Sequence, residues 1–323
     1  MYAPKFWDRK NAWSRLAVAA LAPFGWLYSA TIAWKARNTV SFRPRAAVIC
    51  VGNLTVGGTG KTPVAIAIAR ALIAKGRKPF FLSRGYGGRL KGPIQVIPQH
   101  NARDVGDEPL LLAAAAPVIV SRARDQGARL AVEFGADVIV MDDGHQNFSL
   151  AKDLSFIVID AEQQFGNGQI VPAGPMREFA SQGLARADAV IVVGEGTPDL
   201  AGYTGPVLRA HLTHVDVPEL QGRRVVGFAG IGRPDKFFRS LRAFGADVVA
   251  TKRFADHHVY KMSELARLKA KARSEDALLV TTEKDYVRMT PVEREGIAVL
   301  PVRAVIDNPE ALERLLDTLR PAG

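Results

Sequence analysis

The sequence contains very little cysteine. Cys50 is the single cysteine among 323 residues, so no intramolecular disulfide and no Cys-rich zinc site can form. Low-complexity tracts and heptad repeats are also lacking, and the hydrophobic share (48%) and charged share (23%) are ordinary for a globular protein. These features exclude a disulfide-stapled module and wholesale disorder. The length predicts about two domains, and the cysteine content favours a reducing cytoplasm.

Acidic residues are scarce in the first 45 residues. This segment holds eight Lys or Arg and one acidic residue, Asp8, so it carries +7 of the net charge of +11. The other 278 residues share +4 and have no basic stripe interleaved with aromatics, which argues against nucleic-acid binding. A cationic terminal segment beside apolar residues is typical of a membrane-surface anchor.

Tryptophan is absent after residue 34. All four tryptophans precede that point, and 19 uncharged residues run from Leu16 to Trp34. Six of the 19 are Ala, and Pro23 and Gly25 also dilute the apolar content, so a full bilayer span would be marginal. Because indole rings prefer the headgroup level, residues 1–45 are expected to lie on or dip into a membrane interface. The alternative is a set of amphipathic helices packed on the protein's own core.

From residue 46 onward, short β-branched runs alternate with helical stretches. This pattern predicts an α/β protein with a mostly parallel, P-loop NTPase-like sheet sandwiched by helices. The expected strands are 46–52, 79–83, 118–121, 137–142, 154–160, 187–193, 225–229, 247–250, 277–281 and 298–302. Residues 194–222, rich in Gly, Pro and His, predict a linker. We therefore expect a membrane-associated helical segment at 1–45, a larger α/β domain at 46–212 and a second, smaller α/β domain at 213–323 that closes a cleft.

A glycine-rich loop follows the first expected strand and precedes a helix. Its residues are Thr55, Val56, Gly57, Gly58, Thr59, Gly60, Lys61 and Thr62. Glycines let backbone N–H groups turn around phosphate oxygens, and the helix N-terminus adds its dipole. In such a loop Lys61 reaches the β- and γ-phosphates of ATP, and the Thr62 hydroxyl binds Mg²⁺. Thr55 replaces the usual first glycine, but the remaining glycines keep the mechanism.

Carboxylates are expected beside this loop, because a P-loop enzyme needs one at the end of a neighbouring strand to hold the metal. The apolar run at 138–141 ends in Asp142 and Asp143. Adjacent residues on a strand point to opposite faces, so one of the two is expected to bind Mg²⁺ directly unless the strand has already ended. Glu178 is a further candidate metal ligand.

Six motifs narrow the class of nucleotide-binding protein. They are 53–63, 83–88, 106–109, 142–146, 172–178, and 254–258 followed by 281–285. In this order the sequence resembles the tetraacyldisaccharide 4′-kinase family of the lipid A pathway in Gram-negative bacteria. The resemblance implies that residues 46–212 form a P-loop kinase domain. It implies transfer of phosphate from ATP to the 4′-hydroxyl of a tetraacylated glucosamine disaccharide 1-phosphate, giving lipid IVA. It also implies ATP and Mg²⁺ as cofactors, the cytoplasmic face of the inner membrane as location, and neither nucleic acid nor an obligate protein partner.

The resemblance further implies roles in two of these motifs. Asp107 would accept the proton of the attacking hydroxyl, and His257 would orient it or share the proton, with His258 as the alternative partner. An Asp at this loop-to-helix junction is equally suited to capping the helix. Arg177 and Arg122 are candidate cations for the transferring phosphoryl group, the alternative being surface ion pairs. Residues 83–88 form either a loop that contacts substrate or a simple turn.

A rival class is the dimeric partitioning or maturation ATPase, a switch whose loop reads Lys-Gly-Gly-x-Gly-Lys-Thr. Val56 stands where that class has its first lysine, which argues against it. A nucleic-acid binding protein, suggested by the basic pI of 9.9, is disfavoured because the basic excess is concentrated in the first 45 residues.

Overall fold

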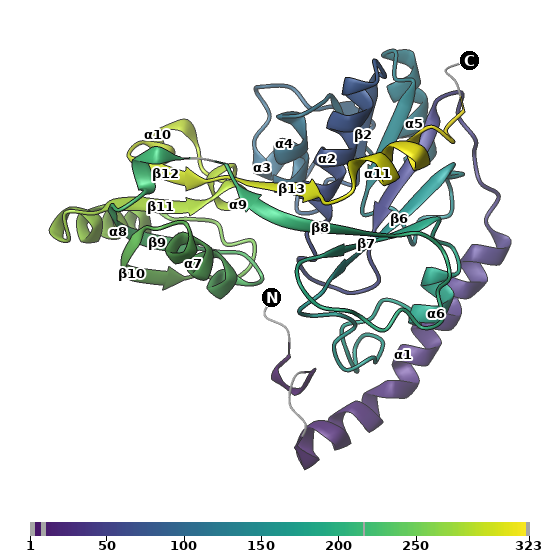
Figure 1. The fold of residues 1–323 in the computed structure, drawn as a ribbon, viewed down its shortest axis with the longest axis horizontal. Helices are drawn as coiled ribbons and strands as arrows, with labels where there is room; N and C mark the ends of the chain where they lie inside the picture. The colour runs from purple at the N-terminus through teal and green to yellow at the C-terminus, as the bar shows by residue number, and fades with distance from the viewer. Residues whose placement is uncertain (1–3, 8–10, 216, 321–323) are drawn as a thin grey trace.

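The computed structural model describes residues 4–7, 11–215 and 217–320 (Figure 1). Asp8, Arg9 and Lys10 of the basic segment, and Asp216 of the expected linker, lie outside the described residues. The described chain forms a large sheet, a small sheet and a long N-terminal helix that projects along one side of the large sheet.

Nine strands of the described chain form the large sheet, in the order β13-β8-β7-β6-β1-β5-β2-β4-β3. Only β13–β8 and β3–β4 pair in antiparallel fashion in this part of the chain. The strands are β1 (Ala47–Gly52), β2 (Pro79–Ser83), β3 (Ile94–Gln95), β4 (Val118–Val120), β5 (Val138–Asp142), β6 (Leu154–Asp160), β7 (Ala189–Val193), β8 (Val207–His214) and β13 (Val302–Ile306). Six of them match expected strands to within two residues. Their apolar runs suit a sheet that is buried on both faces.

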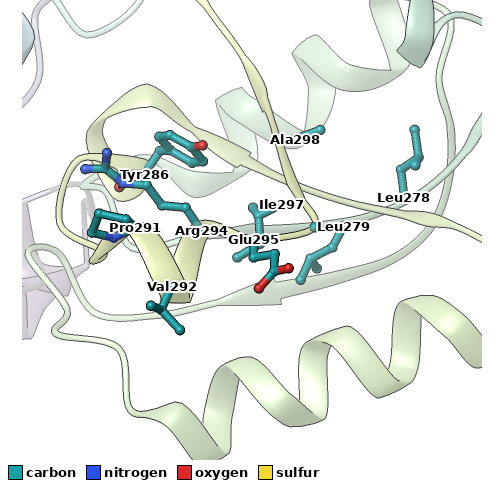
Figure 2. Close-up of a pocket in the computed structure, with 10 residues that line it drawn as sticks. Leu278, Leu279, Tyr286, Pro291, Val292, Arg294, Glu295, Ile297 and Ala298 are labelled. Atoms are coloured by element: carbon teal, nitrogen blue, oxygen red, sulfur yellow. The ribbon is translucent and has the colours of Figure 1, made fainter.

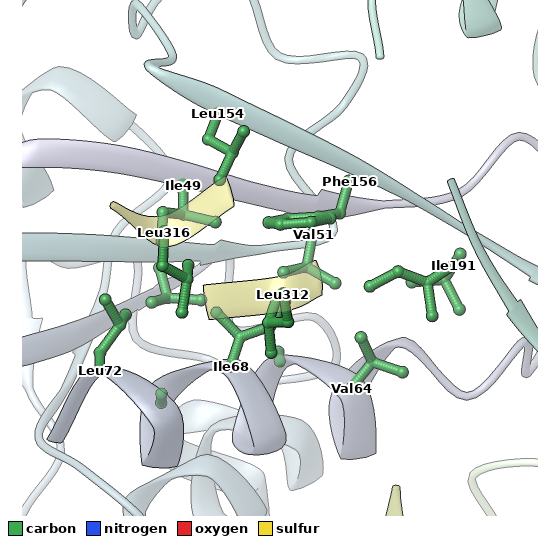
Figure 3. Close-up of a cluster of buried hydrophobic side chains, with 14 of the residues drawn as sticks. Ile49, Val51, Val64, Ile68, Leu72, Leu154, Phe156, Ile191, Leu312 and Leu316 are labelled. Carbon is green, nitrogen blue, oxygen red and sulfur yellow. The ribbon is translucent and has the colours of Figure 1, made fainter. Parts of the chain in front are cut away.

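Helices cover both faces of the large sheet. On one face, α2 (Lys61–Ala74) places Val64, Ile68 and Leu72 against the sheet, at the spacing of one helix face (Figure 3). Leu312 and Leu316 of α11 (Pro309–Leu316) complete that layer. On the other face, α5 (Arg124–Glu133) buries its small side chains. Each fully buried Leu or Ile contributes about 1.5–3 kcal/mol, so α2 is held firmly behind the glycine-rich loop.

The small sheet is wholly parallel, in the order β10-β9-β11-β12. Its strands are β9 (Arg224–Ala229), β10 (Asp247–Arg253), β11 (Leu278–Thr282) and β12 (Ile297–Leu300), and its main helices are α7 (Pro234–Ala243) and α8 (Met262–Ser274). Two hydrophobic clusters cover its two faces. The remaining elements are η1 (Lys5–Trp7), α3 (Ala102–Val105), α4 (Asp107–Ala113), α6 (Ala180–Leu184), η2 (Pro218–Leu220), α9 (Glu283–Tyr286) and α10 (Pro291–Arg294).

The chain returns to the large sheet at its C-terminal end, which corrects three expectations. The expected linker 194–222 contains β8, which pairs with β7. The expected strand 298–302 covers the end of β12 and the start of β13, which belong to different sheets. The expected second domain, 213–323, therefore loses β13 and α11 to the large sheet. The physical reason is that Ala304 and Leu312 bury their side chains in the core of the large domain.

The N-terminal helix α1 (Ala12–Asn38) is largely exposed. Asn11 caps it by accepting a hydrogen bond from the Ser14 backbone N–H at 2.8 Å. By length and composition alone it could cross a membrane, and 17% of its apolar window is buried. It touches the large domain through Gly25, where an added Cβ would lie 2.9 Å from the carbonyl oxygen of Ile170. Because Trp13 is 82% exposed and Trp34 65%, the alternative of a helix packed on the protein's own core is not supported.

Candidate active site

The glycine-rich loop joins β1 to α2 in a conformation that needs glycine. Gly57 and Gly60 have φ values of 116° and 86°, in the region that side-chain-bearing residues rarely adopt. The Asn53 side-chain amide braces the loop by donating to the Thr55 carbonyl at 2.7 Å and to the Thr59 hydroxyl at 3.2 Å. The loop therefore ends with the N-terminus of α2 directed at the space beside it, as a phosphate site requires.

Asp142 lies next to this loop because β1 and β5 are parallel neighbours, with Val51 opposite Asp142. The Thr62 hydroxyl donates to Oδ2 of Asp142 at 3.2 Å. Oδ1 of Asp142 is buried and has no hydrogen-bond partner among the described residues. Burial and the charge of Glu108 raise the pKa of the Asp142 carboxyl to about 7. A hydroxyl beside an unpartnered carboxylate oxygen is a donor set that suits Mg²⁺.

Asp143 has a different environment from its neighbour. Arg177 donates two hydrogen bonds to its carboxylate, at 2.8 and 3.1 Å, and Lys61 Nζ lies 3.7 Å from Oδ1. Burial acts to raise the pKa of Asp143, but Lys61 and Arg177 outweigh it and lower that pKa to about 2. The strand ends at Asp142, and Asp143 has a positive φ of 55°. Asp142 therefore contacts the Thr62 hydroxyl, whereas Asp143 contacts the cations Lys61 and Arg177.

Glu178 forms no hydrogen bond with Thr62 among the described residues, and its oxygens have other partners. Its side chain is fully buried and both oxygens are engaged: Oε2 accepts from Arg186 at 2.6 Å and Oε1 accepts from Gln146 at 3.0 Å. Within the part of the chain that the structure describes, no group of three or more His, Cys, Asp or Glu side chains is arranged to hold a metal. Of the expected metal ligands, only Thr62 and Asp142 share a hydrogen bond here.

Asp107 and His257 meet across the two sheets. His257 Nδ1 lies 3.0 Å from Oδ2 of Asp107, which begins α4. The Asp107 side chain is 4% exposed and that of His257 is 34% exposed. Oδ1 of Asp107 accepts a hydrogen bond from the Glu108 backbone N–H at 2.9 Å. Capping of the α4 N-terminus therefore explains this bond of Asp107 but not its contact with His257. The expected pair is therefore assembled, with His257 as its more accessible member.

The charge state of Asp107 is set by its neighbours. Burial acts to raise the pKa of this carboxyl, but the hydrogen bond with His257 and the charges of Lys284 and Arg288 outweigh it and hold the pKa well below its usual range. Asp107 is therefore ionised at neutral pH. An ionised carboxylate can only accept hydrogen bonds, so Nδ1 of His257 donates to it and Nε2 is the remaining nitrogen.

Arg288 completes this cluster, and sequence reasoning missed it. Its Nε donates to Oδ2 of Asp107 at 2.7 Å, and its Nη1 donates to the Gly230 carbonyl at 2.7 Å and to Asp285 at 2.9 Å. Asp285 is fully buried and also accepts from the Tyr260 hydroxyl at 2.7 Å. The available signal was the spacing of three residues between Asp285 and Arg288 in a short helical segment.

The other expected partner, His258, points elsewhere. Its Nε2 lies 2.9 Å from Oε2 of Glu264, and its ring stacks on Phe254 at 4.7 Å between centroids. His257 is thus the histidine that pairs with Asp107.

The expected substrate loop, residues 83–88, packs against the start of α4. A Cβ on Gly106 would lie 2.5 Å from the Tyr86 carbonyl oxygen, so the two backbones are in close contact. The exposed Tyr86 ring meets the His257 ring edge-on, with centroids 5.8 Å apart. This loop therefore borders the Asp107–His257 pair.

Two arginines that follow β4 differ in burial. Arg122 is exposed, and its backbone N–H donates to the Lys91 carbonyl. Arg124, which sequence reasoning missed, is 3% exposed and donates to the Ser121 carbonyl at 2.5 Å. Burial and the charge of Arg84 lower the pKa of Arg124 to about 10, while Asp143 and Asp142 act in the opposite direction. Arg124 is therefore a buried cation close to both carboxylates.

One hollow of the molecule lies away from these residues. It has a volume of about 870 Å³ and runs along β11 and β12 of the small sheet (Figure 2). Leu279, Val292 and Ile297 line it, and Arg294 at its edge donates to the Tyr286 carbonyl at 2.9 Å. It contains no residue of the glycine-rich loop or of the Asp107–His257 pair.

Comparison with known proteins identifies the family. The family model described as tetraacyldisaccharide-1-P 4′-kinase (LpxK) matches residues 17–320. The chain belongs to the LpxK family. It is 50% identical to the tetraacyldisaccharide 4′-kinase of Paramagnetospirillum magneticum, over 99% of each chain. It is 47% identical to that of Rhodospirillum rubrum, over 99% of this chain and 98% of the relative.

A solved structure of the same family also matches. The crystal structure of LpxK from Aquifex aeolicus in complex with ATP has a TM-score of 0.77 and 26% identity, and the match covers 93% of this chain and 98% of that one. These matches confirm the expected family and the expected enzyme class, a kinase.

Proposed function

We propose that the chain transfers the γ-phosphate of ATP to the 4′-hydroxyl of a tetraacyldisaccharide 1-phosphate, forming lipid IVA. The observation that carries this proposal is the Asp107–His257 pair, which joins the large domain to the small domain. Glu108, which follows Asp107 in the chain, connects this pair to the glycine-rich loop side of the site. It forms an ion pair with Lys284 at 3.1 Å, and its charge raises the pKa of the Asp142 carboxyl.

On the nucleotide side, the glycine-rich loop would act as the P-loop. The backbone N–H groups of residues 57–62 and Lys61 would hold the β- and γ-phosphates. Lys61 is kept near this position by Asp143, at 3.7 Å. Arg177 donates hydrogen bonds to the same carboxylate. We propose that Arg177 holds Asp143 in position and adds positive charge where the phosphoryl group is transferred.

Thr62 and Asp142 are the residues that would hold Mg²⁺. A bound Mg²⁺ would neutralise the negative charge that develops on the phosphate oxygens during transfer. Among the described residues, the buried Oδ1 of Asp142 has no hydrogen-bond partner, and Oδ2 accepts from the Thr62 hydroxyl. Glu178 has no part in this proposal, since Arg186 and Gln146 occupy its oxygens.

On the acceptor side, Asp107 and His257 act as one base. Asp107 stays ionised and holds Nδ1–H of His257, which leaves Nε2 able to accept a proton. Arg288, which belongs to the small domain, holds the Asp107 carboxylate of the large domain by a hydrogen bond. The base is therefore complete only when the two domains are in contact. The 4′-hydroxyl would approach this pair beside Tyr86.

The N-terminal helix would bring the enzyme to the cytoplasmic face of the inner membrane. A substrate with four acyl chains stays in a bilayer, so its kinase must act at the surface. The exposed Trp13, Phe24, Trp26 and Trp34 give α1 an apolar exterior, and Lys35 and Arg37 in its last turn suit anionic lipids.

The test is transfer of labelled phosphate from γ-labelled ATP with Mg²⁺ to detergent-dispersed tetraacyldisaccharide 1-phosphate. A Lys61→Ala chain is the negative control, and Lys75→Ala, which removes a surface lysine paired with Asp317, is the matched positive control. Labelled lipid from the wild type and the Lys75 variant alone supports the proposal. ATP binding without labelled lipid would favour a switch ATPase instead.

A further inference from the structure

A second cavity, about 230 Å³ in volume, lies beside the segment that leaves α1. Ser41, which follows α1 by three residues, lines it together with Phe148, Lys152 and Arg186. The segment is fastened there, since the Ser41 hydroxyl donates to the Phe148 carbonyl at 2.7 Å. No residue of the glycine-rich loop or of the Asp107–His257 pair lines this cavity.

Lys152 is a partly buried cation with few partners. Its Nζ donates to the His145 carbonyl at 2.8 Å, and it forms no ion pair with any described carboxylate. An ammonium group has three N–H donors, so two remain for a ligand. Burial and the nearby charge of Arg186 lower the pKa of Lys152. A cation held in this way is stabilised by any anion that enters the cavity.

Arg186 supplies a second set of donors. Its Nη2 pairs with Glu178 and its Nη1 donates to the Gln182 carbonyl, but Nε is buried with no partner among the described residues. Its guanidinium lies 5.4 Å from the Phe148 ring centroid, and Lys152 Nζ lies 5.6 Å from the same centroid. Two cations therefore gather at one wall of the cavity.

His145 adds a buried acceptor to the same cavity. It is 1% exposed, and its Nε2 lies 3.0 Å from the Gly183 carbonyl, so Nε2 carries the hydrogen. Nδ1 is left as a buried acceptor with no partner among the described residues. The one carboxylate among the lining residues is Asp188, which is exposed and accepts from the Ser155 backbone N–H at 2.7 Å.

We propose that this cavity is a binding site for a phosphate group, carried by a lipid headgroup or free in solution. Phosphate oxygens accept several hydrogen bonds at once, which matches the donors of Lys152 and Arg186, and a P–OH group can donate to His145. The site lies where the chain enters the large domain from α1, whose last turn carries Lys35 and Arg37. It is separate from the loop proposed to bind ATP.

Equilibrium dialysis with labelled inorganic phosphate tests the site in the full chain. The experiment uses Lys61→Ala as background, so that the glycine-rich loop contributes less to binding. Adding Lys152→Gln should weaken phosphate binding by about tenfold or more, because a charge-assisted hydrogen bond is lost. Lys152→Arg should bind within about threefold of the background chain, and Lys75→Gln should bind as the background does.

Equal binding by the Lys152→Gln and background chains would overturn the site. A folding control is the unfolding midpoint, which phosphate should raise for the Lys152→Arg chain and leave unchanged for Lys152→Gln. Flotation with phosphatidylcholine vesicles, with and without phosphatidic acid, distinguishes the sources. If the headgroup is the ligand, Lys152→Gln reduces binding to phosphatidic acid vesicles more than the charge-matched Lys35→Gln does. If free phosphate is the ligand, Lys152→Gln weakens phosphate binding in dialysis but does not reduce binding to phosphatidic acid vesicles more than Lys35→Gln does.

Discussion

The two halves of the candidate active site are built in different ways. The glycine-rich loop follows β1 and Asp142 ends β5, the adjacent parallel strand of the same sheet. This pairing, with the short loop from β1 to α2, brings Thr62 and Asp142 together. Asp107 begins α4 of the large domain and His257 lies in the turn that follows β10 of the small domain, so they meet only because the two domains contact each other. The first half is therefore a property of one domain, whereas the second depends on the arrangement of two.

The largest effect is expected from removing Lys61, in the half built by one sheet. Lys61→Ala takes away the cation nearest the transferring phosphate and should lower kcat/KM on the order of 10³-fold. Labelled-phosphate transfer to the lipid measures it. The fold should persist, because the ion pair with Asp143 at 3.7 Å is the one polar interaction of the Lys61 side chain among the described residues. Retention of more than a tenth of wild-type activity would contradict its role.

Asp107 tests the half built by two sheets. Asp107→Ala should lower kcat about 10²-fold or more, since a general base is lost, while ATP affinity changes by less than about threefold. Transfer kinetics and ATP titration check the two parts. Asp107→Asn is the matched variant, because it keeps the shape without the charge. Near-normal turnover in both variants would contradict the assignment.

Arg288 sharpens the comparison, because it is a positioning residue that links the domains. Arg288→Met leaves Asp107 and the fully buried Asp285 without their cation, so unfolding free energy should fall by about 3–5 kcal/mol. Urea unfolding measures this. The control is Arg253→Met, whose pair with Asp235 is exposed and should be worth at most about 1 kcal/mol. Equal losses in the two variants would contradict a buried interdomain cluster.

The smallest effect on the catalytic site itself is expected from deleting α1. Removal of residues 1–38 keeps Phe42, whose backbone N–H donates to Ser149 at 2.9 Å, and should leave ATP binding unchanged. Turnover of vesicle-embedded substrate should drop about tenfold, since the surface no longer concentrates the enzyme. Turnover of detergent-dispersed substrate should drop less. Loss of ATP binding would instead mean that α1 supports the core.

Sequence reasoning worked where local pattern and local structure coincide. The strands at 79–83 and 154–160 have the expected bounds, because their unbroken apolar runs permit little else in a buried parallel sheet. Sequence reasoning was wrong at β12 and β13. The mostly apolar run 297–306 is interrupted by Pro301 and Arg303, and a residue pattern cannot tell which sheet each part joins.

Site prediction has the same limit. Lys61 and Thr62 follow from a motif with its own mechanism, and Asp142 follows from the end of a neighbouring strand. Glu178 was placed among metal ligands, but Arg186, eight residues further on, binds it in the folded chain. Arg288 was missed because its partner Asp107 is 181 residues away, and only the packing of the two domains makes them neighbours.

A double-mutant cycle on kcat tests most directly whether Asp107 and His257 act as one base across the two domains. The cycle compares the wild type with Asp107→Asn, His257→Ala and the double variant, using transfer to detergent-dispersed substrate. If the pair acts as a unit, the double variant loses no more activity than the worse single variant. If the two losses multiply, each residue acts independently and the proposed shared base is contradicted.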